Sequence, residues 1–190
     1  MQSAVNIVPT ALQGVVIAET EVHCDDRGSF ARLFCARELA PALGDREIVQ
    51  INLSQTRQPG TIRGLHFQHR PHAETKLIRC LKGKVWDVAV DLRAQSPTFL
   101  HWHAEELTPD NARMMIVPEG CAHGFQTLFA ECELLYLHTA PHSAEDEDGV
   151  AWNDPRLGIA WPFPLPSTGG LSERDRQLPM LGESFRGVDA

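Results

Sequence analysis

The stretch KLIRCLKGKVWDVAVDL, from Lys76 to Leu92, consists of two apolar runs on either side of Gly83. Runs rich in Val, Ile, Leu and Trp are typical of β-strands, and a glycine between two of them is typical of a turn. The stretch therefore predicts strands over residues 76–81 and 85–92, with a tight turn between them.

Similar short runs occur on both sides of this stretch, at residues 14–17, 47–54, 60–68, 102–107, 114–118, 124–128 and 133–138. Residues 25–28 favour a turn, and residues 38–43 favour a helix that Pro41 and Gly44 keep short. Strands at intervals of roughly 8–12 residues are typical of sandwiches and barrels. We expect an all-β jelly roll with a few short helices, in one domain of residues 1–190, ending in a short helical or irregular tail.

The composition argues against several classes of protein and of binding partner. The formal net charge of -8 argues against nucleic acid, because a phosphate backbone favours clustered Lys and Arg, but it allows a nucleotide ligand. The sequence shows no signal peptide and no apolar run long enough for a membrane span. Its five cysteines show no C-x-x-C pair, which favours free thiols and a cytoplasmic location.

Arg63 and His66 lie in one strand-like run with Gly64 between them. Alternate residues of an ideal strand share a face, so spacing alone puts these two side chains on opposite faces. A bulge at Gly64 would bring them to the same face. At this point His66 has two interpretations, a functional histidine or a core histidine with a satisfied hydrogen bond.

Two further runs carry candidate acid–base groups. His123 lies in Pro118-Glu119-Gly120-Cys121-Ala122-His123-Gly124-Phe125, whose two glycines indicate a tight loop on a rigid scaffold. Tyr136 is the only tyrosine and lies in an apolar strand. A buried phenol beside a reacting carbon could donate a proton, whereas a core aromatic would only find a hydrogen-bond partner.

A metal site is the main competing chemistry. His101-Trp102-His103 places two imidazoles on one strand face, and the run ending at His123 is similar to part of the second metal motif of cupins. Glu105 and Glu106 follow too closely for the usual cupin spacing, and the flanking alternation predicts that both histidines face solvent. We therefore predict no metal. The sequence also has no Gly-x-Ser-x-Gly elbow and no glycine-rich phosphate loop.

Eleven segments appear in the order typical of one known family. They are Asp26-Arg27-Gly28-x-Phe30, Gln50-x-Asn52-x-Ser54, Ile62-Arg63-Gly64-Leu65-His66-Phe67-Gln68, Lys76-Leu77-Ile78-Arg79, residues 83–93, Ser96-Pro97-Thr98, residues 117–125, Leu135-Tyr136, Trp152-Asn153-Asp154-Pro155, Ile159-x-Trp161-Pro162 and Leu171-Ser172-x-Arg174-Asp175. Together they resemble the dTDP-4-dehydrorhamnose 3,5-epimerase family over roughly residues 10 to 182.

The resemblance implies a cupin-type jelly roll, a homodimer, a nucleotide-diphosphate sugar as substrate, and no metal or redox cofactor. It implies that His66 accepts a proton, that Tyr136 donates one, that Asp175 pairs with His66, and that Lys76 lies near the C4 oxygen of the sugar. The residues that it places around the substrate are Arg63, His123, Arg27, Phe30, Gln50, Asn52, His142, Glu147 and Arg174.

The chemistry of a 4-keto sugar explains these residue types. The ketone acidifies the protons at C3 and C5, so removing either leaves an enolate with its charge on O4. A cation or donor at that oxygen contributes roughly 3–4 kcal/mol, by analogy with one oxyanion-hole donor. Inverting a centre requires protonation from the opposite face, so a base and an acid must flank the ring.

Two positions depart from the rhamnose-pathway pattern. Arg32 replaces a substrate-contacting glutamate, and His142 replaces a tyrosine that stacks on thymine. The changes are either neutral drift or signs of a different base, sugar or stereochemical outcome, such as a 3-only or 5-only epimerase of another dTDP, CDP or GDP sugar pathway. The sequence also leaves open a non-catalytic nucleotide-sugar-binding cupin and, less favoured, a metal-dependent cupin.

Overall fold

The two strands predicted around Gly83 form, but each belongs to a different sheet. In the computed structural model of the chain, which describes residues 5–189, they are β7 (Lys76–Lys82) and β8 (Val85–Asp91). Gly83 has a φ of 80°, and a Cβ there would lie 2.6 Å from Cys132 Sγ, so glycine is required at this crossing.

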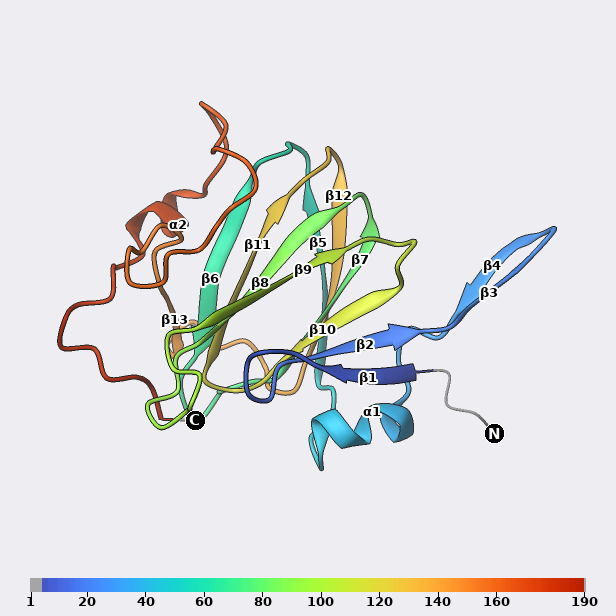
Figure 1. Cartoon of the computed structure of the whole chain (residues 1–190), viewed down its shortest axis with the longest axis horizontal. Coiled ribbons are helices and arrows are strands. Elements are labelled where there is room, and N and C mark those ends of the chain that lie inside the picture. The colour runs from blue at the N-terminus through green and yellow to red at the C-terminus, as the bar shows by residue number, and fades with distance from the viewer. Residues whose placement is uncertain (1–4, 190) are drawn as a thin grey trace.

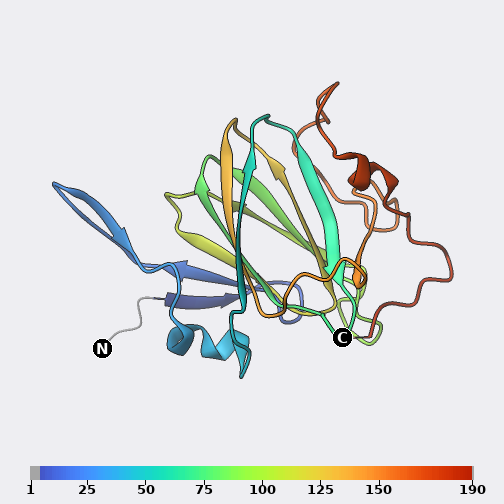
Figure 2. The same cartoon turned by 180° about the vertical axis from the view of Figure 1, so that it is seen from behind.

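Antiparallel strands with short connections give two facing sheets and a hairpin (Figures 1 and 2). The six-stranded sheet has the order β1-β2-β10-β7-β12-β5, the five-stranded sheet has β13-β6-β11-β8-β9, and β3 pairs with β4. The remaining strands are β1 (Val5–Pro9), β2 (Val16–Thr20), β3 (Val22–Asp25), β4 (Gly28–Ala31), β5 (Gln50–Thr56), β6 (Ile62–Gln68), β9 (Trp102–Leu107), β10 (Arg113–Val117), β11 (Cys121–Thr127), β12 (Cys132–His138) and β13 (Glu147–Gly149). The predicted all-β jelly roll is confirmed.

The main core lies between the two sheets. Ile78 of β7 and Met115 of β10 pack there with Ala89 of β8 and Phe125 of β11. Leu77 points to the other face of β7 and joins a second cluster under the early helix. Because both faces of β7 are covered, residues 76–80 are all buried instead of alternating between buried and exposed.

The predicted early helix is α1 (Ala36–Leu43), which begins two residues before the predicted start. Leu39 and Leu43 lie one turn apart on its buried face and pack on the six-stranded sheet. Pro41 stands inside the helix, so the expectation that it limits the length is wrong. Gly44 ends the helix with a φ of 60°, and its N–H donates to Ala40 O at 2.8 Å.

Strands β2 and β11 begin at other residues than predicted. β2 begins at Val16 because Gly14 and Val15 belong to the preceding turn. β11 begins at Cys121, so His123 lies within a strand and only residues 118–120 form the predicted turn. Strands β1, β3, β4 and β13 were not predicted, since short exposed segments carry little alternation.

The C-terminal segment runs along the outer face of the five-stranded sheet, next to β6 and β13 (Figures 1 and 2). Its Leu157 and Trp161 pack against Leu65 and Val88 of that sheet. Its helix is α2 (Glu173–Gln177), in agreement with the predicted short helical tail. Among residues 5–189, no helix is long and apolar enough to cross a membrane. All five cysteines are free thiols, as predicted.

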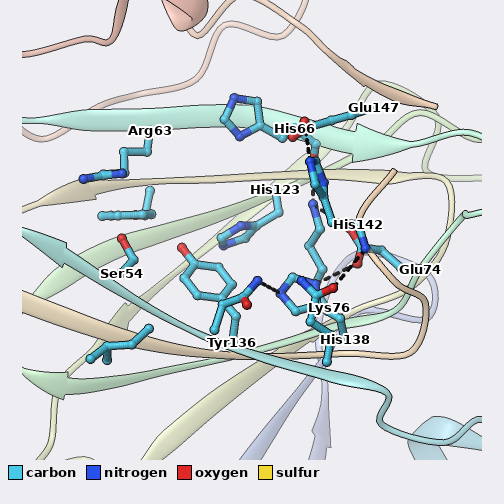
Figure 3. Close-up of a pocket in the computed structure, with 14 residues that line it drawn as sticks. Ser54, Arg63, His66, Glu74, Lys76, His123, Tyr136, His138, His142 and Glu147 are labelled. Carbon is cyan, nitrogen blue, oxygen red and sulfur yellow. Dashed lines mark hydrogen bonds and ion pairs between the residues drawn. The ribbon is translucent and has the colours of Figure 1, made fainter. Parts of the chain in front are cut away.

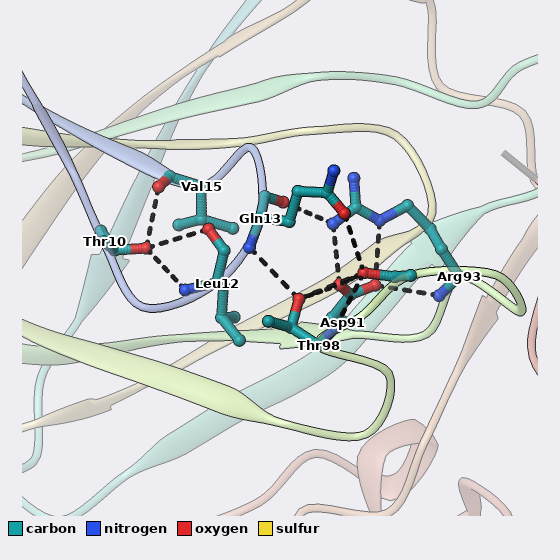
Figure 4. A network of polar contacts seen from close by, with 8 residues as sticks. Thr10, Leu12, Gln13, Val15, Asp91, Arg93 and Thr98 are labelled. Carbon is teal, nitrogen blue, oxygen red and sulfur yellow. Dashed lines mark hydrogen bonds and ion pairs between the residues drawn. The ribbon is translucent and has the colours of Figure 1, made fainter.

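A buried carboxylate, Asp91, joins the N-terminal turn to the end of β8 (Figure 4). It accepts hydrogen bonds from the side chains of Arg93, Ser96 and Thr98, and Arg93 also donates to Gln13 O. Burial alone would raise the pKa of Asp91, but these hydrogen bonds outweigh burial and lower it.

We expect Asp91→Asn to lower the free energy of unfolding by about 2–4 kcal/mol at pH 7, because it leaves three partly buried donors without their buried anion. The pKa of Asp91 is depressed in the folded state, so its contribution is present above the unfolded value of about 3.9 and is lost as pH falls through the folded value. Urea unfolding at pH 7 and pH 3 measures both effects. The exposed Asp110→Asn is the matched control, and equal stability of wild type and Asp91→Asn at pH 7 would contradict the prediction.

Candidate active site

A pocket of about 520 Å³ opens between the two sheets (Figure 3). Strands β6 and β11 line it from one sheet, and β5, β7 and β12 line it from the other. Most residues expected around a substrate line it together, namely Gln50, Asn52, Arg63, His66, Lys76, His123, Tyr136, His142 and Glu147. The pocket is therefore built by residues from both sheets.

A bulge in β6 brings Arg63 and His66 to the same pocket. In the pairing of β6 with β11, His66 lies opposite His123, while Arg63 lies opposite Phe125. Three residue steps on β6 thus match two on β11, which is the bulge considered at Gly64 from the sequence. Gly64 has a φ of 117°, and a Cβ there would lie 2.7 Å from His123 O, so the strands approach this closely only with glycine.

His66 is held by a buried carboxylate from α2. Asp175 Oδ1 lies 2.7 Å from His66 Nε2, and Asp175 Oδ2 accepts from Gly64 N at 3.4 Å. The N-cap Ser172 positions Asp175, since its hydroxyl accepts from Asp175 N at 3.0 Å. Burial raises the pKa of Asp175, but the bond to His66 and the other contacts give a net lowering. An ionised Asp175 at Nε2 favours the tautomer with the proton there, which leaves Nδ1 free to accept a proton.

Tyr136 comes from β12, on the opposite sheet from His66. Its ring meets His123 edge-on at 5.7 Å between centroids and stacks on His138 at 6.0 Å. Burial raises the pKa of Tyr136 well above its usual range, and the charge of Asp87 adds to the effect. The phenol therefore keeps its proton at neutral pH and can act as a donor.

His123 is fixed by Asp87, a residue without a predicted role. His123 Nε2 lies 2.8 Å from Asp87 Oδ1, and Asp87 is completely buried in β8. Burial raises the pKa of Asp87, while His123 partly offsets this. Asp87 lies opposite Phe125 in the pairing of β8 with β11, a long-range register that sequence spacing does not reveal.

Two further buried residues, Glu74 and His138, line the pocket beside Lys76. Lys76 Nζ lies 3.3 Å from Glu74 Oε1, and Glu74 Oε2 lies 2.7 Å from His138 Nδ1. The sequence contained a usable signal for His138, because it follows Tyr136 by two residues and so shares its strand face. Glu74 lies in a connection with no periodic pattern and was not predictable in this way.

The open side of the pocket carries polar residues from three segments. Gln50 Oε1 accepts from His142 N at 3.0 Å. Glu147 Oε2 lies 2.8 Å from Arg174 Nη1 and 3.7 Å from His142 Nε2. Arg174 and Asp175 line an adjoining pocket together with Arg63 and His66, so the two hollows share a wall. The side chain of His142 is 55% exposed where it lines the pocket.

Three residues of the N-terminal hairpin region lie elsewhere. Arg27 and Phe30 belong to the β3–β4 hairpin, which projects away from the two sheets (Figure 1), and they line only a separate shallow hollow. The side chain of Arg27 is 90% exposed, and Phe30 is 71% exposed. Arg32, a departure from the family pattern, pairs with Glu38 of α1 at 2.7 Å. Within one chain, none of the three reaches the pocket.

The histidines considered for a metal lie on β9 and its approach. His101 is exposed as predicted, but the prediction that His103 faces solvent is wrong. The His103 side chain is 22% exposed, its Nε2 lies 3.6 Å from Glu105 Oε2, and burial lowers its pKa. No group of three or more His, Cys, Asp or Glu side chains within residues 5–189 is arranged to hold a metal ion.

Comparisons with known proteins agree with this geometry. The family model described as dTDP-4-dehydrorhamnose 3,5-epimerase matches residues 9–183. The Salmonella typhimurium protein of that name is 40% identical over 94% of this chain and 97% of its own length. The crystal structure of the Bacillus anthracis enzyme with TDP and PPi bound is 41% identical, with a TM-score of 0.89, and covers 94% of this chain and 100% of that one.

A 3'-monoepimerase from Streptomyces bikiniensis in complex with dTDP-quinovose is also similar, at 30% identity and a TM-score of 0.82, covering 91% of this chain and 86% of that one. The match over nearly the whole chain, together with a His–Asp pair and a tyrosine on facing walls of one pocket, leads to one conclusion. The chain belongs to the dTDP-4-dehydrorhamnose 3,5-epimerase family.

Proposed function

We propose that the protein inverts C3, C5 or both in a nucleotide-diphosphate 4-keto-6-deoxy sugar, of the kind represented by dTDP-4-dehydro-6-deoxyglucose. The observation that carries this proposal is the placement of His66 and Tyr136 on opposite sheets, with Lys76 lining the same pocket. Inversion needs a base and an acid on the two faces of one sugar ring, and this arrangement supplies both.

In the proposed reaction, side chains of the protein remove and supply the protons at carbon. His66 Nδ1 takes a proton from the carbon next to the ketone, and the electron pair of the broken C–H bond passes to O4 as an enolate. The ammonium group of Lys76 donates a hydrogen bond to that oxygen. Tyr136 then gives its proton to the other face of the same carbon as the ketone re-forms. Proton return from His66 to Tyr136 through solvent completes the cycle, without a metal or redox cofactor.

The positive groups at the pocket mouth suit a diphosphate. Arg63 lines both the main and the adjoining pocket, and Arg174 lines the adjoining one. Gln50 and Asn52 offer amides for the sugar, and His142 offers a ring for the base. Structures similar to this chain hold TDP or a dTDP sugar, so we propose dTDP as the first nucleotide to test. CDP and GDP sugars are the comparisons, because imidazole stacks with less area than the tyrosine of the rhamnose pattern.

An exchange assay tests the proposed function. Incubation with dTDP-4-keto-6-deoxyglucose in D₂O should introduce deuterium at C3 and C5, measured by NMR, with formation of the inverted sugar. Deuterium incorporation at only C3 or only C5 would favour the second candidate function, an epimerase that inverts a single centre. The similarity to the 3'-monoepimerase supports this candidate. Tight binding without exchange at either carbon would contradict the proposal and favour a non-catalytic nucleotide-sugar-binding protein.

We also propose that the active form is a homodimer in the cytoplasm, each chain a single domain. Val49 and Ile51 near the edge strand β5 are 57% and 61% exposed, and Phe30 on the hairpin is 71% exposed, which is costly in water. If Arg27 and Phe30 contact substrate, as the resemblance implies, they must enter the pocket of a second copy. A dimer would thus cover these apolar side chains and complete each pocket.

A complementation experiment tests this assembly. We expect Arg27→Ala and His66→Asn to be poorly active alone, whereas refolded mixtures regain activity. One site of each mixed dimer would combine His66 from one chain with Arg27 from the other, giving up to about a quarter of wild-type activity for statistical mixing. Sedimentation should give twice the chain mass. A monomer in solution, or mixtures no more active than their parts, would overturn the proposal.

A further inference from the structure

The pocket wall contains a buried polar cluster outside the proposed proton-transfer pair. Glu74, Lys76 and His138 are each only 9% exposed. Lys76 and His138 lie directly opposite each other on β7 and β12, and Glu74 precedes β7 by two residues. The carboxylate of Glu74 contacts both of these basic side chains and so links the two strands.

The contacts of Lys76 leave one of its donors for a ligand. Its Nζ donates to His66 O at 3.2 Å and lies 3.3 Å from Glu74 Oε1 (Figure 3). An ammonium group carries three N–H donors and no acceptor. With two donors directed at the protein, the third is available to an oxygen in the pocket, and its direction is set by the first two.

The carboxylate of Glu74 is itself held in place by His138. Glu74 Oε2 lies 2.7 Å from His138 Nδ1, and His138 Nε2 lies 3.3 Å from Asn52 Nδ2. An amide nitrogen can only donate, so Nε2 accepts and the proton of a neutral His138 lies on Nδ1. Burial raises the pKa of Glu74, but the hydrogen bond from His138 and the charge of Lys76 lower it overall, which keeps Glu74 ionised.

We propose that Glu74 and His138 are a positioning pair, in which His138 orients Glu74 and Glu74 holds Lys76 so that one N–H points at the enolate oxygen. The proposal rests on the proposed function and extends it to two residues that act through Lys76 rather than on the reacting carbons. The effect of an oxyanion donor depends on preorganised direction, so loosening Lys76 weakens transition-state binding more than substrate binding.

The first test is Glu74→Gln, which keeps the size of the side chain and removes its charge. We expect kcat for epimerisation to fall by about 10- to 100-fold, with KM changed by less than about threefold. Glu133→Gln on β12, whose side chain contacts Gln55 outside the pocket, is the matched control. An unchanged kcat in Glu74→Gln, with a folded protein by thermal unfolding, would overturn the proposal.

A double-mutant cycle tests whether Glu74 acts through Lys76. Lys76→Ala should lower kcat by about 10²- to 10³-fold, and adding Glu74→Gln to it should change kcat by less than about twofold. If the double variant instead loses kcat by the product of the two single-variant factors, Glu74 acts independently of Lys76 and the proposal is overturned. His138→Asn keeps an N–H near the Nδ1 position and should retain more activity than His138→Leu; equal activity of these two variants would contradict the role of His138.

Deuterium exchange by the wild-type protein distinguishes failure of the proposed function from failure of the positioning pair alone. If wild type shows no deuterium wash-in, the proposed function fails and the positioning pair fails with it. If wild type exchanges deuterium and Glu74→Gln does so at the same rate, only the positioning pair fails.

Discussion

Replacing His66 by Asn should reduce deuterium wash-in at C3 and C5 by about 10²- to 10⁴-fold, the usual contribution of a positioned base. Asn has no basic nitrogen, and its amide stands near the Nδ1 position rather than at Nε2, which lies 2.7 Å from Asp175 in the wild type. Both exchange and net inversion should be lost together, because neither can occur before the C–H bond is broken. Mass spectrometry of sugar recovered from D₂O measures the exchange.

The matched control for this variant is His69→Asn, just beyond the end of the same strand. His69 is half exposed, pairs with Asp148 at 3.0 Å and does not line the pocket, so its replacement should leave the exchange rate near the wild-type value. Exchange by His66→Asn at more than about a tenth of the wild-type rate would show that another group is the base.

Tyr136→Phe should separate exchange from inversion. We expect formation of the inverted product to fall by about 10²- to 10³-fold, because the opposite face of the enolate loses its positioned acid. Exchange with solvent should fall much less, since His66 can still remove a proton and return a deuteron to the same face. The product of this variant is therefore deuterated substrate with unchanged configuration, which NMR distinguishes from the epimer.

The ring of Phe preserves the contacts of Tyr136 with His123 and His138, so the thermal midpoint should change little. If Tyr136→Phe lost deuterium exchange and inversion equally, the phenol would be needed before the C–H bond is broken. The proposed roles of His66 as the base and Tyr136 as the acid would then be wrong. If inversion continued at the wild-type rate, another donor on that side of the pocket would have to supply the proton.

The fold class was accessible from the sequence because strand formation is a local property. The apolar runs on either side of Gly83 became β7 and β8, and the order of short motifs pointed to the family. Local pattern did not reveal that these two strands belong to different sheets. Nor did it show that His123 lies inside β11, because the Gly and Pro residues near it also suit a loop.

The amino-acid sequence specifies which chemical groups this protein has: a histidine, a lone tyrosine, a lysine and a carboxylate in motifs that resemble one family. How these groups meet depends on the three-dimensional fold. The bulge at Gly64 turns Arg63 and His66 to one face, the facing sheets set Tyr136 opposite His66, and the β7–β12 register places His138 beside Lys76. These relations depend on strand register and on contacts between residues distant in the chain, which residue spacing within one strand cannot specify.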